Sequence, residues 1–412
     1  MSKDSTWPLV LTMAKAGQRE KETGDSSTEK LAMTGRERTQ LAVTHRQPDR
    51  VPFDLGGMAQ SGIHRLAYAN LRRHLGLPEG AVRRQNIITQ AAIIDDDIRK
   101  RLGIDTYFIP GKWADPAAAS VRVEGEYSVY EDEWGVGRRM PREGGLYYDI
   151  YKHPLNNDDW RGRLESYQWP DPLGGDRFAG LAEEAKQAQA KGLFVVLMGL
   201  CPGIMEMAIW LRGYERFYMD LALQPEVCRF FLDKIGELKI AYWRRAMELA
   251  GDYIDAVNEA DDLAGQNSLL MSANMYRQVV KPAHQRLLRG IKEAAAKVKI
   301  IFHSCGAVRE IIPDLIEIGV DILNPIQTSA KDMAAEELKS EFGQNLCFWG
   351  GGIDTQHVLL EGNAQQITEH VRSNIKTLGR GGGFVFGPTH VYQADVPPEK
   401  FMVMWETVQR YG

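Results

Sequence analysis

Six apolar runs of strand length alternate with helical segments in the part of the chain from residue 193 onward. The runs are LFVVLMG, YIDAVNEA, VKIIFHSCG, DILNPIQ, NLCFWGGGID and GFVFGP. Each run is continuously apolar, which is typical of strands buried on both faces of a parallel sheet. Six such units in succession, with earlier strand candidates such as PDRVPFDLGG, favour a (β/α)8 TIM barrel over a doubly wound sheet. No Gly-rich phosphate fingerprint follows any of the runs, which argues against a dinucleotide-binding fold.

The chain divides into three kinds of segment. Residues 1–33 include the polar, unpatterned stretch MAKAGQREKETGDSSTEK and are predicted to form a mobile arm. The barrel is predicted over residues 34–412, beginning with a helix whose capping box pairs Thr34 with Glu37. Within it, about residues 111–172, aromatic, Gly and Pro residues with short alternating stretches predict an inserted set of antiparallel hairpins. The aromatic side chains there either pack this small sheet or line a pocket.

Composition excludes several classes of function. The 412 residues carry a formal net charge of −5 and contain no long basic block, so nothing indicates a nucleic-acid partner. No apolar run approaches the roughly 18–20 residues that cross a membrane. Four cysteines do not make a disulfide framework, and a reducing cytoplasm is the expected location.

Polar side chains stand at the end of nearly every predicted strand, where TIM-barrel active sites gather. The run NEADD supplies the carboxylates that we predict to be catalytic, which are Glu259, Asp261 and Asp262. The alternative is that these acids cap the helix that follows. Later strand ends supply three side chains predicted to bind substrate, which are Asn324, Gln327 and Asp354.

His303 and Cys305 form the strongest candidate for a metal site. Residues i and i+2 of a strand point to the same face, so both side chains can reach one ion. Zinc takes Cys sulfur and His nitrogen, and catalytic zinc keeps one position open beside three protein ligands. His390, after the last strand, is the preferred third ligand, and Cys201, Cys347 or a rim acid are the alternatives. The competing interpretation is a packed cysteine beside a hydrogen-bonded histidine.

These motifs resemble the uroporphyrinogen decarboxylase superfamily from GRERTQLAVTHRQPDRVPFDLGG to VPPEKF, nearly the whole chain beyond the arm. Within it the chain is similar to the cobalamin-associated methyltransferases, which include the coenzyme M methyltransferases and relatives in O-demethylation systems. HSCG matches the zinc-binding His-x-Cys pair of that branch, and NEADDLAGQ, DILNPIQ and GGGIDTQ match its general pattern. The resemblance implies a zinc enzyme that moves a methyl group between a corrinoid (cobalamin) protein and a small-molecule donor or acceptor.

Two departures from the family patterns affect the expected substrate. The decarboxylases carry an Arg-Gln-x-x-Arg run that binds porphyrin carboxylates, whereas the comparable strand end here reads FDLGGMAQSG. The coenzyme M branch has a third zinc ligand, a Cys, after the final strand, where this chain has Thr389 and His390. The alternative functions are a decarboxylase of a carboxylated cyclic substrate, using Asp261 or Asp262, and a non-catalytic barrel that binds a corrinoid or tetrapyrrole.

Overall fold

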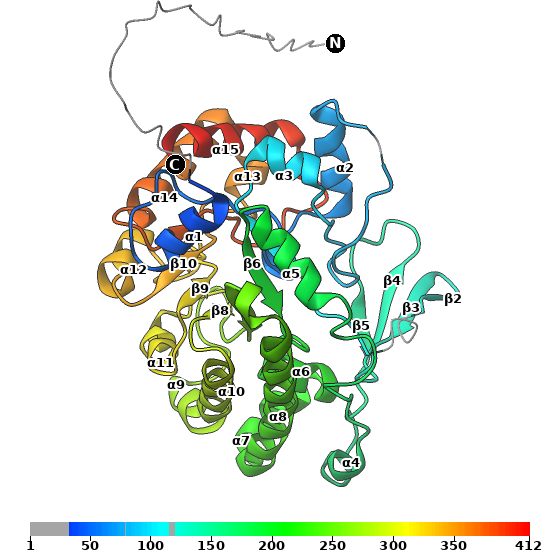
Figure 1. The fold of residues 1–412 in the computed structure, drawn as a ribbon. Helices are drawn as coiled ribbons and strands as arrows, with labels where there is room; N and C mark the ends of the chain where they lie inside the picture. Colours follow the sequence, from blue (N-terminus) through cyan, green and yellow to red (C-terminus); the bar gives the residue numbers. More distant parts are fainter. Residues whose placement is uncertain (1–32, 79, 115–119) are drawn as a thin grey trace, which may run out of the picture. The chain divides into compact units, whose positions relative to one another are not determined.

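The computed structural model describes residues 33–78, 80–114 and 120–412. Met33–Gly412 form one compact unit, and the arm predicted for residues 1–33 lies outside the described residues except for Met33. A curled sheet of seven parallel strands organises this unit (Figure 1). In sheet order the strands are β1 (Thr106–Ile109), β6 (Phe194–Met198), β7 (Ala256–Ala260), β8 (Lys299–His303), β9 (Ile322–Asn324), β10 (Cys347–Trp349) and β11 (Phe384–Val385). The six predicted runs correspond to β6–β11, so this prediction is confirmed.

Helices connect the successive strands of this sheet. They are α5 (Leu181–Ala190), α6 (Ile204–Arg212), α7 (Tyr214–Leu223), α8 (Pro225–Ala250), α9 (Ala273–Met275), α10 (Lys281–Ala294), α11 (Ile312–Glu317), α12 (Ala335–Phe342), α13 (Val358–Glu361) and α14 (Ala364–Leu378). A single turn of π-helix, Tyr276–Val280, joins α9 to α10. The remaining helices are α1 (Gly35–Val43), α2 (Arg65–His74), α3 (Asp96–Leu102), α4 (Trp160–Ser166) and α15 (Pro398–Tyr411). Within the described ranges, no helix combines the length and the apolar character needed to cross a membrane.

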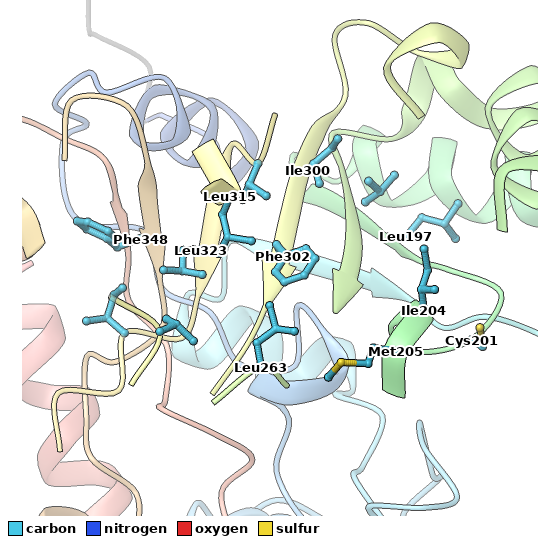
Figure 2. Packing of buried hydrophobic residues seen from close by; sticks show 14 of the residues in the cluster. Leu197, Cys201, Ile204, Met205, Leu263, Ile300, Phe302, Leu315, Leu323 and Phe348 are labelled. Atoms are coloured by element: carbon cyan, nitrogen blue, oxygen red, sulfur yellow. The ribbon is translucent and has the colours of Figure 1, made fainter. Parts of the chain in front are cut away.

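Alternate residues of each strand belong to two separate hydrophobic clusters. Phe194, Ile301 and Trp349 pack together on the inner face of the curled sheet. Their neighbours in sequence, such as Phe302 and Phe348, belong to the larger cluster that includes the surrounding helices (Figure 2). Because side chains alternate along a strand, this division identifies which strand residues face the interior and which face the helices.

The N-terminal segment of the unit lies between the two strands at the ends of the sheet order, β11 and β1. The predicted capping box is confirmed, since Thr34 Oγ1 accepts from Glu37 N at 3.2 Å and Glu37 accepts from Thr34 N at 2.8 Å. The stretch predicted as a short strand makes one parallel bridge, Phe53 with Phe386. Asp54 N donates to Phe386 O at 2.8 Å, and Asp105 N donates to Phe53 O at 3.0 Å. The stretch therefore contacts β11 on one side and the residue that precedes β1 on the other.

A second sheet lies within the segment for which the sequence predicts hairpins. Its four antiparallel strands are β2 (Arg122–Glu124), β3 (Tyr127–Glu131), β4 (Gly137–Pro141) and β5 (Asp149–Lys152). It stands beside the seven-stranded sheet in Figure 1. Some of its aromatic side chains pack against one another, as Tyr130 does with Tyr148 at 5.0 Å between ring centroids. Trp134, in the turn between β3 and β4, instead lines a cavity.

Candidate active site and metal centre

A cavity of about 680 Å³ opens at the carboxyl ends of the strands. Its wall includes Phe108 and Met198, at or near the ends of β1 and β6, and the turn that follows Met198. Ionisable side chains also line the cavity. They are Arg84, Lys112, Asp132, Cys201, Glu206, Asp262, His303 and His390. The cavity thus occupies the edge of a parallel sheet where enzyme active sites gather.

His303 is oriented by a chain of hydrogen bonds that determines its tautomer. Asn324 Nδ2 donates to the carbonyl oxygen of Trp349 at 2.7 Å, so Asn324 Oδ1 is the atom that faces His303. Asn324 Oδ1 lies 2.6 Å from His303 Nδ1. Because an amide oxygen only accepts, His303 Nδ1 carries the proton and Nε2 presents its lone pair. This is the arrangement in which a histidine binds a metal and a neighbouring group holds its other nitrogen.

Cys305 reaches His303 through a turn and not by strand alternation. Strand β8 ends at His303, so the argument from i and i+2 on a strand does not apply to this pair. Asp262 Oδ1 instead accepts the Cys305 backbone N–H at 2.9 Å, and Gln327 Oε1 accepts that of Gly306 at 2.8 Å. Gly306 has φ +88°, and a Cβ there would lie 2.4 Å from the carbonyl oxygen of Gly265. The turn leaves Cys305 Sγ 3.5 Å from His303 Nε2.

His390 completes a three-residue cluster. Ligand atoms of His303, Cys305 and His390 all lie within 4.8 Å of one another. The loop that carries His390 is anchored by the preceding residue, because Thr389 N and Oγ1 both donate to Ile353 O at 3.0 and 2.9 Å. Burial and the neighbouring His303 lower the pKa of His390 to about 4, so the ring is neutral near pH 7. The three residues are a candidate metal site, since His390 is neutral and His303 holds its Nδ1 against Asn324, which leaves Nε2 on the side of Cys305.

Unlike His390, Cys305 does not have in the metal-free protein the protonation state that a metal ligand needs. Burial raises its pKa well above the usual value, and the charges of Asp262 and Glu206 raise it further. In the absence of a cation the thiol therefore stays protonated at neutral pH. A bound metal ion reverses this balance because it stabilises the thiolate directly.

Two of the three predicted catalytic acids lie outside the cavity wall. Glu259 alternates with inward-facing neighbours on β7, so it points to the helix layer. There it accepts from Trp243 Nε1 at 2.5 Å and pairs with Lys239 at 2.9 Å, both on α8. Asp261 follows the end of β7 and accepts the backbone N–H groups of Met205 and Glu206 at 2.8 and 2.6 Å. Asp262 is the member of the trio that faces the cavity.

The predicted substrate-binding residues are not among those that line the cavity. Asn324 orients His303, and Gln327 holds the turn after Cys305, as described above. Asp354 Oδ1 accepts the backbone N–H of Gln356 at 2.8 Å and that of His357 at 3.2 Å, just before α13. The structure therefore gives all three residues a contact within the protein, two of them next to the candidate metal site.

Sequence reasoning missed Glu206, which lines the cavity from the first turn of α6. Burial raises the pKa of Glu206 from its usual 4.5 to about 8, and the charges of Asp262 and Asp261 add to this. The sequence offered one signal for Glu206, because an acidic residue three positions after Gly203 has the spacing found at a helix N-terminus. It also missed the aromatic wall of the cavity outside the insertion, to which Trp210 belongs.

Cys201 and Cys347, the alternative metal ligands, are both buried. Cys201 lines the cavity, and burial raises its pKa to about 12. Cys347 lies on β10 among the inward-facing side chains of the sheet. It therefore lies inside the curled sheet at the start of β10, whereas His303 stands at the end of β8.

Fold and site together define a parallel α/β protein with a cavity and a His-Cys-His cluster at the carboxyl ends of its strands. The uroporphyrinogen decarboxylase (URO-D) family matches residues 134–411, which is more than half of the chain. The chain therefore belongs to the uroporphyrinogen decarboxylase family. No curated protein sequence matches the chain.

Solved structures resemble the fold at low sequence identity. A methyltransferase from Methanosarcina mazei has a TM-score of 0.62 and 18% identity, covering 92% of this chain and 99% of that protein. PbGH5A, a glycoside hydrolase family 5 enzyme from Prevotella bryantii B14, has a TM-score of 0.38 and 11% identity, with coverage of 92% and 99%. Native xylanase 10B from Thermotoga maritima has a TM-score of 0.37 and 10% identity, with coverage of 62% and 91%. The two hydrolases are too dissimilar to bear on function, and the methyltransferase supports the fold.

Proposed function

We propose that this protein is a zinc-dependent methyltransferase that moves a methyl group between a corrinoid protein and a small molecule. The observation that carries the proposal is the convergence of His303, Cys305 and His390, whose ligand atoms lie within 4.8 Å of one another, with both histidines in the cavity wall. Membership of the uroporphyrinogen decarboxylase family and the fold likeness to a protein called a methyltransferase support it. Cysteines that are all free thiols are compatible with the cytoplasmic location that we also propose.

We further propose that the curled sheet closes into a (β/α)8 barrel. The support comes from Phe53 and its neighbours, which hydrogen bond to Phe386 on one side and to Asp105 on the other. An eighth strand in that place joins β11 to β1. Closure puts the ends of all strands around one mouth, which leaves a single open face for a corrinoid carried on a separate protein.

The donor set fits zinc. Two neutral imidazoles and one thiolate are ligands that zinc takes, and three protein ligands leave a fourth position for substrate. When bound there, zinc supplies a positive charge that activates or polarises the group exchanging the methyl. His303, oriented by Asn324, and Cys305, oriented by Asp262, would hold the ion together with His390. The aromatic wall of the cavity would exclude water and position the apolar part of the substrate.

The family name also favours a second candidate, decarboxylation of a carboxylated cyclic substrate. In that case Asp262 would stabilise a protonated intermediate at the cavity. A substrate with several carboxylates needs several cations, and the cationic side chains that line the described cavity are Arg84 and Lys112. Both side chains are exposed, so no buried Lys or Arg of the described wall is in place to hold a substrate carboxylate. The wall therefore supports the methyltransferase proposal more strongly than decarboxylation.

Elemental analysis and methyl-transfer assays of the same preparations test the proposal. We expect one zinc per chain and methyl transfer between a corrinoid and at least one member of a panel of methyl donors and thiol acceptors. Cys305→Ala should lose most of the zinc, because the thiolate is the only anionic ligand of the three. Cys347→Ala, which also removes a thiol but from the core, should keep it. A wild-type protein without metal that still transfers methyl groups would refute the zinc assignment, and decarboxylation without methyl transfer would favour the second candidate.

A further inference from the structure

Among the acids that line the described cavity wall, Glu206 is the one with no partner side chain and no proposed place at the metal site, and its carboxyl has a backbone hydrogen bond with Gly203. His303 and His390 are proposed as ligands, and Asp262 holds the Cys305 backbone. Asp132 Oδ1 accepts the backbone N–H groups of Trp134 and Val136, and its Oδ2 lies 3.7 Å from Arg138.

The position of Glu206 is set by a buried network at the start of α6. Asp261 Oδ1 accepts Glu206 N at 2.6 Å, and Asp261 Oδ2 lies 2.6 Å from His284 Nε2. Asp261 is 0% exposed and His284 1% exposed. Gly203 is required for this approach, because a Cβ there would lie 1.8 Å from Asp261 Oδ1. The first turn of α6 is thus held rigidly, with Glu206 directed to the cavity that His303 and His390 also line.

We propose that Glu206 is the general acid that protonates the departing oxygen of a methyl ether substrate. This inference rests on the proposed function and deepens it by naming the class of methyl donor. The methyl–oxygen bond breaks, the oxygen keeps the bonding electron pair, and that oxygen takes the carboxyl proton of Glu206. The methyl carbon forms its new bond to a corrinoid cobalt(I) on the partner protein, which supplies the electron pair. Glu206 is left as a carboxylate and regains a proton from solvent.

The charges around Glu206 suit this role. Burial, Asp262 and Asp261 favour its protonated form, whereas Arg138 on β4 and a hydrogen bond from the Gly203 backbone favour the ionised form. A metal cation nearby lowers a carboxyl pKa, which brings a value of about 8 closer to neutrality, where general acids work best. A donor of another class, a quaternary ammonium, releases a neutral amine and needs no proton. The acid therefore selects oxygen-bound methyl groups.

The first test compares leaving groups. Wild type, Glu206→Gln and Glu206→Asp are assayed with the corrinoid protein, phenyl methyl ether, 4-nitrophenyl methyl ether and tetramethylammonium. Gln keeps the size of the side chain and donates a hydrogen bond but no proton. We expect Glu206→Gln to lose about 10²–10⁴-fold in kcat with phenyl methyl ether and less than about tenfold with the nitro compound, whose oxygen leaves unaided. Glu206→Asp should recover part of the loss. An equal loss with both ethers, or a preference of wild type for tetramethylammonium, would overturn the proposal.

The second test needs no methyl transfer. The binding of 4-nitrophenol, the product of one test ether, to the zinc-loaded protein is followed by absorbance between pH 6 and 10. A protonated Glu206 donates to the bound phenolate, so wild-type affinity should fall about tenfold per pH unit once Glu206 ionises. In Glu206→Gln the affinity should not fall in this way, and Glu215→Gln, an exposed acid-to-amide change on α7, should behave as wild type. Equal profiles for wild type and Glu206→Gln overturn the role of Glu206, whereas absence of transfer from every donor overturns the proposed function.

Discussion

Replacement of Glu206 by Gln should stabilise the metal-free protein at alkaline pH. Burial raises the pKa of this carboxyl from 4.5 to about 8. In the unfolded chain the group ionises near its usual value, so between these two pH values the folded state binds more protons than the unfolded state. The free energy of unfolding of wild type therefore falls as pH rises from about 4.5 to 8. A glutamine does not ionise, so the variant lacks this dependence.

The expected size follows from the shift. Each pKa unit corresponds to about 1.4 kcal/mol, so a shift from 4.5 to about 8 sets an upper limit of about 5 kcal/mol above pH 8. Relaxation around an ionised carboxylate reduces this value, and we expect about 2–5 kcal/mol. With roughly 380 residues in the folded unit and an unfolding entropy of about 2.1 cal/mol/K per residue, 1 kcal/mol moves Tm by about 1.2 °C. Glu206→Gln should thus raise Tm by about 2–6 °C at pH 9.

Thermal unfolding of metal-free protein at intervals from pH 5 to pH 9 measures this effect. The metal must be removed because a cation near Glu206 would lower its pKa. The two proteins should have similar Tm values at pH 5 and diverge as pH rises. Glu215→Gln provides the matched control, because the same chemical change on an exposed side chain should leave the profile of wild type unchanged. A constant difference between Glu206→Gln and wild type at all pH values would show that Glu206 ionises normally in the folded protein.

Three further predictions concern neighbouring groups. Asn324→Ala should weaken zinc binding about 10–100-fold, measured by chelator competition, because His303 loses the partner that holds its Nδ1. In metal-free protein Cys305 should be alkylated before the fully buried Cys347, and its rate should rise steeply with pH because its thiol pKa is raised. Mass spectrometry of peptides over time measures the two rates, and faster alkylation of Cys347 would contradict this expectation. Lys239→Met should lower the free energy of unfolding, measured with urea, by about 3–5 kcal/mol, since Glu259 would keep a buried charge without its partner. The double variant Lys239→Met with Glu259→Leu should recover much of that loss.

Much of the fold could be predicted from local sequence. Runs buried on both faces recur with a short period, and only a parallel sheet covered by helices buries such runs, so β6–β11 were identifiable. The capping box at Thr34 depends on residues three apart and was equally readable. The pair His303 and Cys305 drew attention for the same reason, since both residues stand where one strand ends. These features depend on interactions within a few residues, which a sequence displays directly.

Tertiary structure decided which polar residues share the site. Strand alternation sends Glu259 to the helix layer, and Asp261 turns to the start of α6, although the sequence places both beside Asp262. Glu206 and His390 join His303 in the cavity wall from distant parts of the chain. Which strand ends become neighbours depends on how the sheet curls, and that curvature results from packing summed over the whole core. No local pattern records such packing, so the place of Glu206 in the same cavity wall as His303 became visible only in the folded chain.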